Sequence, residues 1–200
     1  MRQKNNHPHI FQIIAPVYGL FFKSQKRRYK KDLELIMREN ILSNSMSVID
    51  IGCGTGALAS VLADFGFQTT GMDSALGMLK IARRKTKNQK VSFIQGNILN
   101  DININDNTFD VSVASYVAHG LKRSERLVMY KEMKRISKHK VMFFEYNQKR
   151  NIFSDIIEFL EGGDYFDYIK IVESELKENF SKLTIIPLSK RGALYVCEIE

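Results

Sequence analysis

The feature that most constrains this chain is a glycine-rich stretch at residues 48–58, VIDIGCGTGAL. An apolar, strand-like run leads directly into a tight turn, and a helix-forming run begins at Ala57. Gly52, Gly54 and Gly56 can adopt positive φ and carry no Cβ, so a ligand can approach the backbone closely. The first N–H groups of a helix have no partner within the helix and can bind polar ligand groups. The stretch therefore predicts a strand, a turn and a helix N-terminus that together hold a ligand.

The acid Asp50 lies two residues before the first glycine, near the carboxyl end of the predicted strand. Its carboxylate can accept a hydrogen bond from a cationic group of the ligand, directly or through water. The same negative charge would repel a pyrophosphate. Asp50 therefore favours a ligand that has an ammonium group.

The sequence Asp-Ile-Gly-Cys-Gly-Thr-Gly at 50–56, followed by Gly-Met-Asp at 71–73, resembles the glycine motif and acidic loop of class I S-adenosylmethionine-dependent methyltransferases. Within that family the chain is similar to small-molecule methyltransferases of the ubiquinone and menaquinone biosynthesis type. The resemblance implies that the turn lies under the methionine portion of S-adenosylmethionine and that Asp73 binds both ribose hydroxyls. The cofactor-binding residues on this interpretation are Asp50, Gly52, Cys53, Gly54, Gly56, Asp73, Ser74, Asn97, Ile98 and Ser115.

Two positions on the adenine side depart from the family pattern. The residue after the ribose-binding acid is commonly apolar and covers the adenine, but this chain has Ser74. The family often has Gly-Asp after the third strand, and this chain has Gly96-Asn97. The amide oxygen of Asn97 can still accept from the adenine amino group, with Ile98 against the ring. The alternative interpretation is that Asn97 only caps the loop.

The order of predicted elements indicates an α/β fold. We expect a Rossmann-like, seven-stranded, mostly parallel sheet with helices on both faces, which the family closes with a C-terminal antiparallel strand pair. Residues 1–45 are expected to form an N-terminal arm and a helix, with Ser24 as its N-cap, that cap the active site, and residues 46–200 the S-adenosylmethionine-binding domain. The predicted strands are 46–51, 67–72, 91–95, 109–114, 140–144, 183–188 and 193–199, and the predicted helices after the arm are 56–65, 74–85, 123–137, 152–160 and 169–180.

The methyl acceptor is expected beyond the carboxyl ends of the fourth and fifth strands, where ligands bind in open α/β sheets. His119 is a candidate catalytic residue because imidazole titrates near neutrality and can take a proton from the acceptor. It can equally position the substrate or cap the following helix. Tyr18 can line the pocket or simply pack the arm, and the glycine-rich loop before Tyr165 can form a lid or a plain helix stop. The substrate-side candidates are Tyr18, Tyr116, His119, Glu145, Tyr146 and Tyr165.

The formal net charge is +8, and much of it comes from the basic stretch at residues 23–31. This stretch can be a footprint for RNA or an anionic membrane surface, or only the solvated face of a helix. Two cysteines without disulfide-framework spacing, and a start that lacks a secretory signal, predict a cytoplasmic protein. The scattered histidines and cysteines have no metal-ligand spacing, so no metal is expected.

The leading hypothesis is direct in-line transfer of a methyl group from S-adenosylmethionine to a small-molecule acceptor. A methyltransferase of RNA or of a membrane surface, acting through the helix at 23–31, is the main alternative. A nicotinamide-dependent oxidoreductase is a weaker one, because Gly52-x-Gly54-x-x-Ala57 satisfies the loose dinucleotide fingerprint. The absence of an Asn/Asp-Pro-Pro-Tyr/Phe motif and of a Pro-Cys nucleophile disfavours methylation of nucleic-acid bases. A non-catalytic cofactor-binding module is the fourth alternative.

Overall fold

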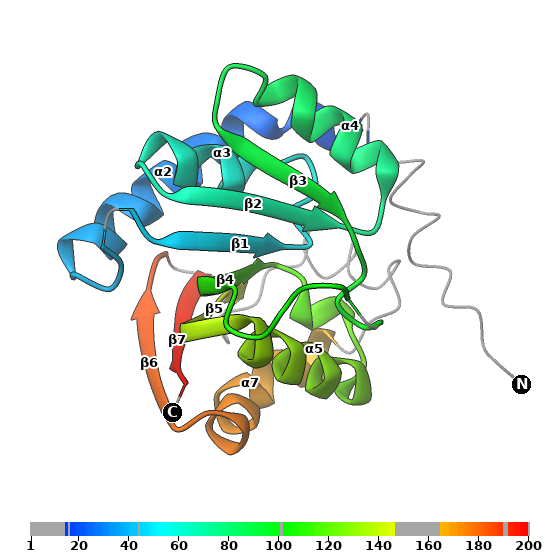
Figure 1. Ribbon diagram of the computed structural model, residues 1–200. Helices are drawn as coiled ribbons and strands as arrows, with labels where there is room; N and C mark the ends of the chain where they lie inside the picture. Colours follow the sequence, from blue (N-terminus) through cyan, green and yellow to red (C-terminus); the bar gives the residue numbers. More distant parts are fainter. Residues whose placement is uncertain are drawn as a thin grey trace, which may run out of the picture. The chain divides into compact units, whose positions relative to one another are not determined.

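The computed structural model describes residues 15, 17–43, 45–100, 102–146, 165–189 and 192–199. Seven strands form one sheet in the order β3-β2-β1-β4-β5-β7-β6 (Figure 1). The expected seven-stranded, mostly parallel Rossmann-like sheet is thereby confirmed. The chain divides into two compact units, Met1–Asn97 and Ile98–Glu200, called here the first and the second unit.

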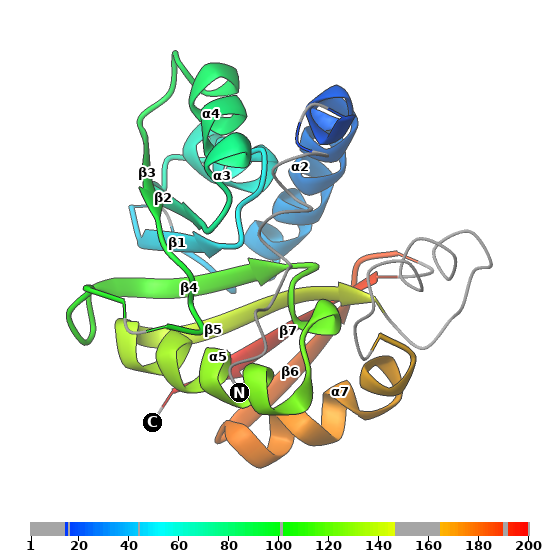
Figure 2. The ribbon, with the colours of Figure 1, turned by 90° about the vertical axis from the view of Figure 1, so that its right-hand side faces the viewer.

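The first unit has three parallel strands, β1 (Ser47–Ile51), β2 (Gln68–Asp73) and β3 (Val91–Gln95). Parallel neighbours require crossover connections, and helices supply them. Helices α2 (Phe22–Arg38), α3 (Ala57–Asp64) and α4 (Leu76–Lys85) lie on one face of these strands (Figure 2). The first six residues of α3 are all buried, since α2 packs against this helix.

The second unit begins with β4 (Phe109–Ser115), a short 3-10 helix η1 (Ala118–Gly120) and α5 (Arg123–Ile136). Strand β5 (Ser137–Tyr146) pairs in parallel with β4. The remaining elements are α7 (Tyr165–Asn179), β6 (Lys182–Pro187) and β7 (Gly192–Glu198). Strand β7 runs antiparallel to both β5 and β6, which confirms the expected antiparallel terminal pair.

Several local predictions in the helices were wrong. Helix α2 begins at Phe22 rather than after an N-cap at Ser24, and the Ser24 hydroxyl instead donates to the Phe21 carbonyl at 2.8 Å. Residues 15 and 17–19, expected to belong to an irregular arm before the helix, are helical. Leu76 and Val128 are apolar residues of the helices expected at 74–85 and 123–137, where their spacing suggests an inward face, but they are 44% and 42% exposed. Neighbouring residues in the same helices fill the core instead, namely Met78, Leu79, Ala82, Met129, Met133 and Ile136.

Two other predictions fall in a part of the chain that the structure does not describe. The helix expected at 152–160 and the glycine-rich loop at 161–164 lie outside the described residues. The helix expected from residue 169 is observed as α7 and begins four residues earlier, at Tyr165.

Candidate functional site

The glycine turn between β1 and α3 has the backbone conformation that its sequence predicts. Gly52, Gly54 and Gly56 have φ values of 68°, 53° and 79°, all in the left-handed region. A Cβ added at Gly54 would meet nothing within 4 Å, whereas one at Gly56 would lie 3.0 Å from Ala82 and 3.3 Å from Phe93. Gly56 is therefore needed for packing, while Gly54 presents bare backbone to open space.

Asp73 lies at the end of β2, and the turn itself fixes its carboxylate. Oδ2 accepts from the Gly54 N–H at 2.8 Å, and Oδ1 accepts from the Ala75 N–H at 2.8 Å. Burial raises the pKa of Asp73, and the hydrogen bonds from Ala75, Gly54 and Ser74 lower it in part. The two carboxylate oxygens offer about four lone-pair sites between them, and the three backbone donors do not use all of these. Asp73 can therefore hold the turn and still accept a hydrogen bond from a ligand.

Asp50 is the most unusual group of the first unit. It is 1% exposed, and its Oδ2 atom has no hydrogen-bond partner among the described residues. Burial, and then the charge of Asp73, raise the pKa of Asp50 to about 8, although a hydrogen bond from the Ala59 backbone opposes the shift. An isolated buried carboxylate is costly unless a cation pairs with it. Asp50 thus fits a ligand that brings an ammonium group.

The other residues expected at the cofactor are divided between the two units. Cys53 is 8% exposed, and its N–H donates to the Met72 carbonyl at 3.0 Å, which ties the turn to β2. Burial raises the pKa of the Cys53 thiol well above its ordinary value. Ser74 and Asn97 are half-buried in the first unit. The buried Ile98 and the half-buried Ser115 belong to the second unit.

Three of the residues expected at the acceptor form an aromatic cluster in the second unit. The ring centroids of Tyr116 and Tyr146 are 4.7 Å apart, and those of His119 and Tyr146 are 5.3 Å apart. Tyr116 has a φ of 55°, which is uncommon outside glycine, and its N–H donates to the Phe144 carbonyl at 2.8 Å. Strained conformations of this kind tend to occur at functional sites.

Glu145 is buried and pairs with His119 of this cluster. It is 1% exposed, and its Oε2 lies 2.7 Å from Nδ1 of His119. Its other oxygen accepts from the Ala118 N–H at 2.9 Å. A buried carboxylate in this position orients the imidazole and stabilises positive charge on it. We had expected Glu145 to line the pocket, and sequence reasoning did not foresee its pairing with His119.

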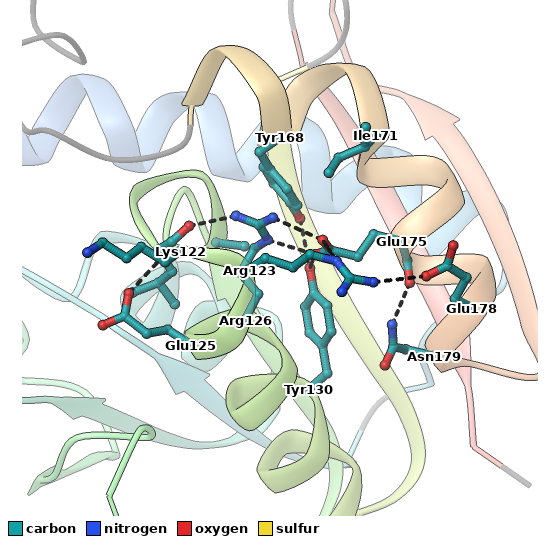
Figure 3. Close-up of polar contacts among 12 residues, drawn as sticks. Lys122, Arg123, Glu125, Arg126, Tyr130, Tyr168, Ile171, Glu175, Glu178 and Asn179 are labelled. Carbon is teal, nitrogen blue, oxygen red and sulfur yellow. Dashed lines mark hydrogen bonds and ion pairs between the residues drawn. The ribbon is translucent and has the colours of Figure 1, made fainter.

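A second buried acid holds the loop after η1 in place (Figure 3). Arg126 of α5 and Glu175 of α7 form a bidentate ion pair. Nε of Arg126 donates to Oε1 of Glu175 at 2.6 Å, and Nη2 donates to Oε2 at 2.9 Å. Arg126 also donates to the Leu121 carbonyl at 2.6 Å, and the Tyr130 hydroxyl donates to Glu175 at 2.9 Å. The Arg126 guanidinium lies 4.5 Å from the ring centroid of Tyr168. This cluster, Arg126–Glu175–Tyr130–Tyr168, fixes α7 to α5 and to the loop that follows His119.

The remaining substrate-side candidates are one residue of the first unit and one whose side chain is not described. Tyr18 is half-buried and packs in the first unit with Ala15, Ala75 and Met78. Tyr165 begins α7, and its side chain lies outside the described residues. The four candidates that come together in the second unit are Tyr116, His119, Glu145 and Tyr146.

Known proteins share both the motifs and the fold of this chain. A family model described as a methyltransferase domain matches residues 49–144, which begin just before the glycine turn and end in β5. The chain belongs to the class I S-adenosylmethionine-dependent methyltransferases. Its sequence is 27% identical over 133 residues to a demethylmenaquinone methyltransferase from Paenarthrobacter aurescens. The aligned residues are 64% of this chain and 49% of that protein.

A sterol 4-C-methyltransferase from Caenorhabditis elegans is 30% identical over 131 residues, which are 63% of this chain and 39% of that protein. The chain thus spans about half or less of these methyltransferase relatives.

Solved structures extend the likeness over the whole fold. A putative S-adenosylmethionine-dependent methyltransferase from Methanococcus maripaludis aligns with a TM-score of 0.74 and 22% sequence identity. The alignment covers 100% of this chain and 96% of that one. The magnesium protoporphyrin IX methyltransferase of Synechocystis, solved with bound S-adenosylhomocysteine, aligns with a TM-score of 0.65, with 14% identity, 88% of this chain and 83% of that one. At these identities the likeness establishes the fold.

The described part of the chain has neither a membrane-spanning helix nor a metal-binding cluster. Over the part of the chain that the structure describes, no helix is long and apolar enough to cross a bilayer. Within the same residues, no group of three or more His, Cys, Asp and Glu side chains is arranged to hold a metal ion.

Proposed function

We propose that this chain binds S-adenosylmethionine and transfers its methyl group to a small-molecule acceptor. The observation that supports the cofactor most directly is Asp50, a buried carboxylate whose Oδ2 atom has no partner among the described residues. A cofactor with an ammonium group supplies the missing cation. A dinucleotide would bring phosphates to the same turn, and phosphates supply no cation to pair with Asp50.

The first unit would hold the cofactor with backbone and two acids. Gly52 and Gly54 would lie under the methionine portion, because Gly54 presents open backbone there. Asp50 would accept from the ammonium group, and Asp73 from the ribose hydroxyls with the lone pairs that Gly54 and Ala75 do not use. Ser74, Asn97 and Ile98 would surround the adenine. When bound, the cofactor supplies a methyl group that its sulfonium makes electrophilic.

The second unit would hold the acceptor. Tyr116, His119 and Tyr146 offer flat aromatic surfaces against which an apolar or aromatic molecule can pack. Glu145 holds His119 at Nδ1, so the imidazole is kept in one orientation for contact with the acceptor or for taking its proton. The chain's task is then to align the acceptor and exclude water. The demethylmenaquinone and sterol methyltransferases among its relatives support a small-molecule acceptor.

The region before residue 46 is proposed to cover the active site, with Tyr18 at the substrate. Its described part includes α2, which packs against α3 directly after the glycine turn. Tyr18 packs against α4 through Ala75 and Met78, two and five residues after Asp73. An arm anchored at that place lies near the ribose-binding acid.

Calorimetric titration with S-adenosylhomocysteine tests the proposal. We expect binding by the wild-type protein, no binding of NADH, and an affinity lowered about 10- to 100-fold in Asp73→Asn. The matched control is Asp64→Asn, because Asp64 is an exposed acid of α3 that pairs with Lys26 on the surface. Equal affinity in a folded Asp73→Asn variant would contradict the ribose assignment. Binding of NADH in place of S-adenosylhomocysteine would support an oxidoreductase instead.

A further inference from the structure

The net positive charge of the protein comes from the first unit. Residues 1–97 contain 15 Lys and Arg against 6 Asp and Glu, whereas residues 98–200 contain 15 against 16. Two of the six acids in the first unit, Asp50 and Asp73, are buried or half-buried at the glycine turn. The surface of the first unit is therefore strongly basic, and the proposed methyl transfer makes no use of that charge.

The outer face of α2 is the densest part of this basic surface. Lys23, Arg27, Lys30 and Lys31 are exposed, and none of them forms an ion pair with any residue that the structure describes. Lys26, in contrast, is half-buried and pairs with Asp64 at 2.7 Å. The opposite face of the helix is apolar and packs into the unit through Phe22, Tyr29, Leu33 and Ile36. The basic face is thus fixed outward by the packing of the apolar one.

Exposed apolar side chains lie directly before this basic face. Leu20 is 81% exposed, Phe21 is 56% exposed and Val17 is 54% exposed. The residues between them are anchored, since Tyr18 packs on α4 and a Cβ at Gly19 would lie 3.4 Å from Ile81. Single exposed apolar residues are ordinary. Here three exposed apolar side chains lie within five residues, and their neighbours hold them outward. A row of cations that pair with no described residue follows, so the two groups form a distinct surface.

We propose that this basic–apolar surface, Val17, Leu20, Phe21, Lys23, Arg27, Lys30 and Lys31, binds the surface of an anionic lipid bilayer. Lipid phosphates complement the four cations, and Val17, Leu20 and Phe21 enter the boundary between headgroups and acyl chains. The apolar residues decide between a membrane and a nucleic acid. Single-stranded nucleic acids need aromatic rings interleaved with the cations. Of the three aromatics beside these cations only Phe21 is exposed, because Phe22 and Tyr29 are buried.

Co-sedimentation with lipid vesicles tests this surface. We expect the wild-type protein to bind vesicles of equal phosphatidylcholine and phosphatidylglycerol, and not vesicles of phosphatidylcholine alone. Binding should fall steeply at about 0.5 M NaCl, because salt screens the charges. Arg27→Gln with Lys31→Gln should lower the partition coefficient roughly 30-fold, about fivefold for each charge. Leu20→Ser with Phe21→Ser should lower it about tenfold or more with the charges intact.

The control is Lys122→Gln with Lys131→Gln, which removes two exposed cations of the second unit and should leave vesicle binding unchanged. Circular dichroism of the Arg27/Lys31 variant reports whether the fold is retained. Its affinity for S-adenosylhomocysteine reports whether the proposed cofactor site is intact. Equal losses in the control and in the Arg27/Lys31 variant would overturn the proposal, as would failure of the wild type to bind anionic vesicles. Binding of a single-stranded oligonucleotide that depends on Arg27 and Lys31 but not on Leu20 and Phe21, without vesicle binding, would identify a nucleic-acid surface instead.

Discussion

Replacing Asp50 by Asn is expected to change the stability of the ligand-free protein and its affinity for the cofactor in opposite directions. Asp50 is 1% exposed, and its Oδ2 atom has no partner among the described residues. Asn has almost the same shape and carries no charge. The variant therefore replaces a buried carboxyl group, which can ionise, by a side chain that stays neutral at every pH, while the packing around β1 is retained.

The stability effect follows from the pKa of Asp50. Burial and the charge of Asp73 raise this pKa from an ordinary 3.8 to about 8. Between those two pH values the unfolded chain has lost the proton and the folded chain keeps it. The free energy of unfolding therefore falls as pH rises, by about 1.4 kcal/mol per pH unit, and the fall ends above the folded-state pKa. When the pH rises from about 5 to about 8, ionisation of Asp50 in the unfolded chain thus lowers the free energy of unfolding of the wild type by about 3–4 kcal/mol. The Asn side chain of the variant does not ionise, so the variant does not lose this free energy.

A second contribution does not depend on pH. The Asn side chain places an amide N–H₂ group where Oδ2 lies, and an unsatisfied buried donor costs about 1–3 kcal/mol. The variant should therefore be equal to or less stable than wild type at about pH 5, and more stable at about pH 8. Its affinity for S-adenosylhomocysteine should fall roughly 30-fold, because the ammonium group loses an ionised partner.

Urea unfolding of ligand-free protein at four pH values between about 5 and 8 measures the effect. Wild type, Asp50→Asn and the exposed-acid control Asp64→Asn are compared at each pH. The difference between Asp50→Asn and wild type should grow toward high pH, while the control should follow wild type. Parallel pH profiles for all three proteins would refute the reasoning that Asp50 keeps its proton in the folded state.

Three further predictions concern the second unit and the glycine packing. Glu145→Gln should lower turnover about 10- to 100-fold and shift its pH profile, with S-adenosylhomocysteine affinity unchanged by calorimetry, because Glu145 acts through His119. Arg126→Met should lower the free energy of unfolding by about 3–5 kcal/mol in urea titrations, since Glu175 is left charged and buried; Arg126→Met with Glu175→Leu should recover most of it. Gly71→Ala should lower the melting temperature by several degrees, because its Cβ would lie 2.7 Å from the Phe93 ring. The comparison variant is Gly66→Ala, where the new Cβ meets nothing within 4 Å but φ is +88°. It measures the cost of backbone strain without a steric clash.

The parts of the fold that short stretches of sequence encode could be predicted. The glycine turn, the left-handed Gly66 after α3 and the terminal strand pair each depend on a few neighbouring residues. Helix phase was harder, because an apolar residue in the first turn, such as Leu76, fits the pattern of a buried face and still lies outside it. Ser24 has the chemistry of an N-cap, but the helix begins two residues earlier at Phe22.

The side-chain partnerships of the second unit could not be predicted. Arg126 and Glu175 are 49 residues apart, and His119 and Glu145 are 26 apart. Only the three-dimensional structure reveals such pairs. A charged residue within the periodic apolar pattern of α5 was the one available signal for Arg126, and it does not identify a partner. The individual residues His119 and Glu145 could be named as candidates because they lie beyond the end of β4 and among the last residues of β5, and ligands bind at the carboxyl ends of strands in open α/β sheets.

The three fully buried acids of the described chain differ in whether the protein itself supplies their partners. Glu175 receives hydrogen bonds from Arg126 and Tyr130, and Glu145 has His119 and the Ala118 N–H. Both are satisfied by the protein itself, so neither needs a ligand to pair its charge. Asp50 has the Ala59 backbone on one side and an unpartnered Oδ2 on the other, beside a glycine turn with open backbone. A chain optimised for stability alone would place an apolar residue at position 50, so the acid at this position supports our proposal that the site takes a ligand with an ammonium group.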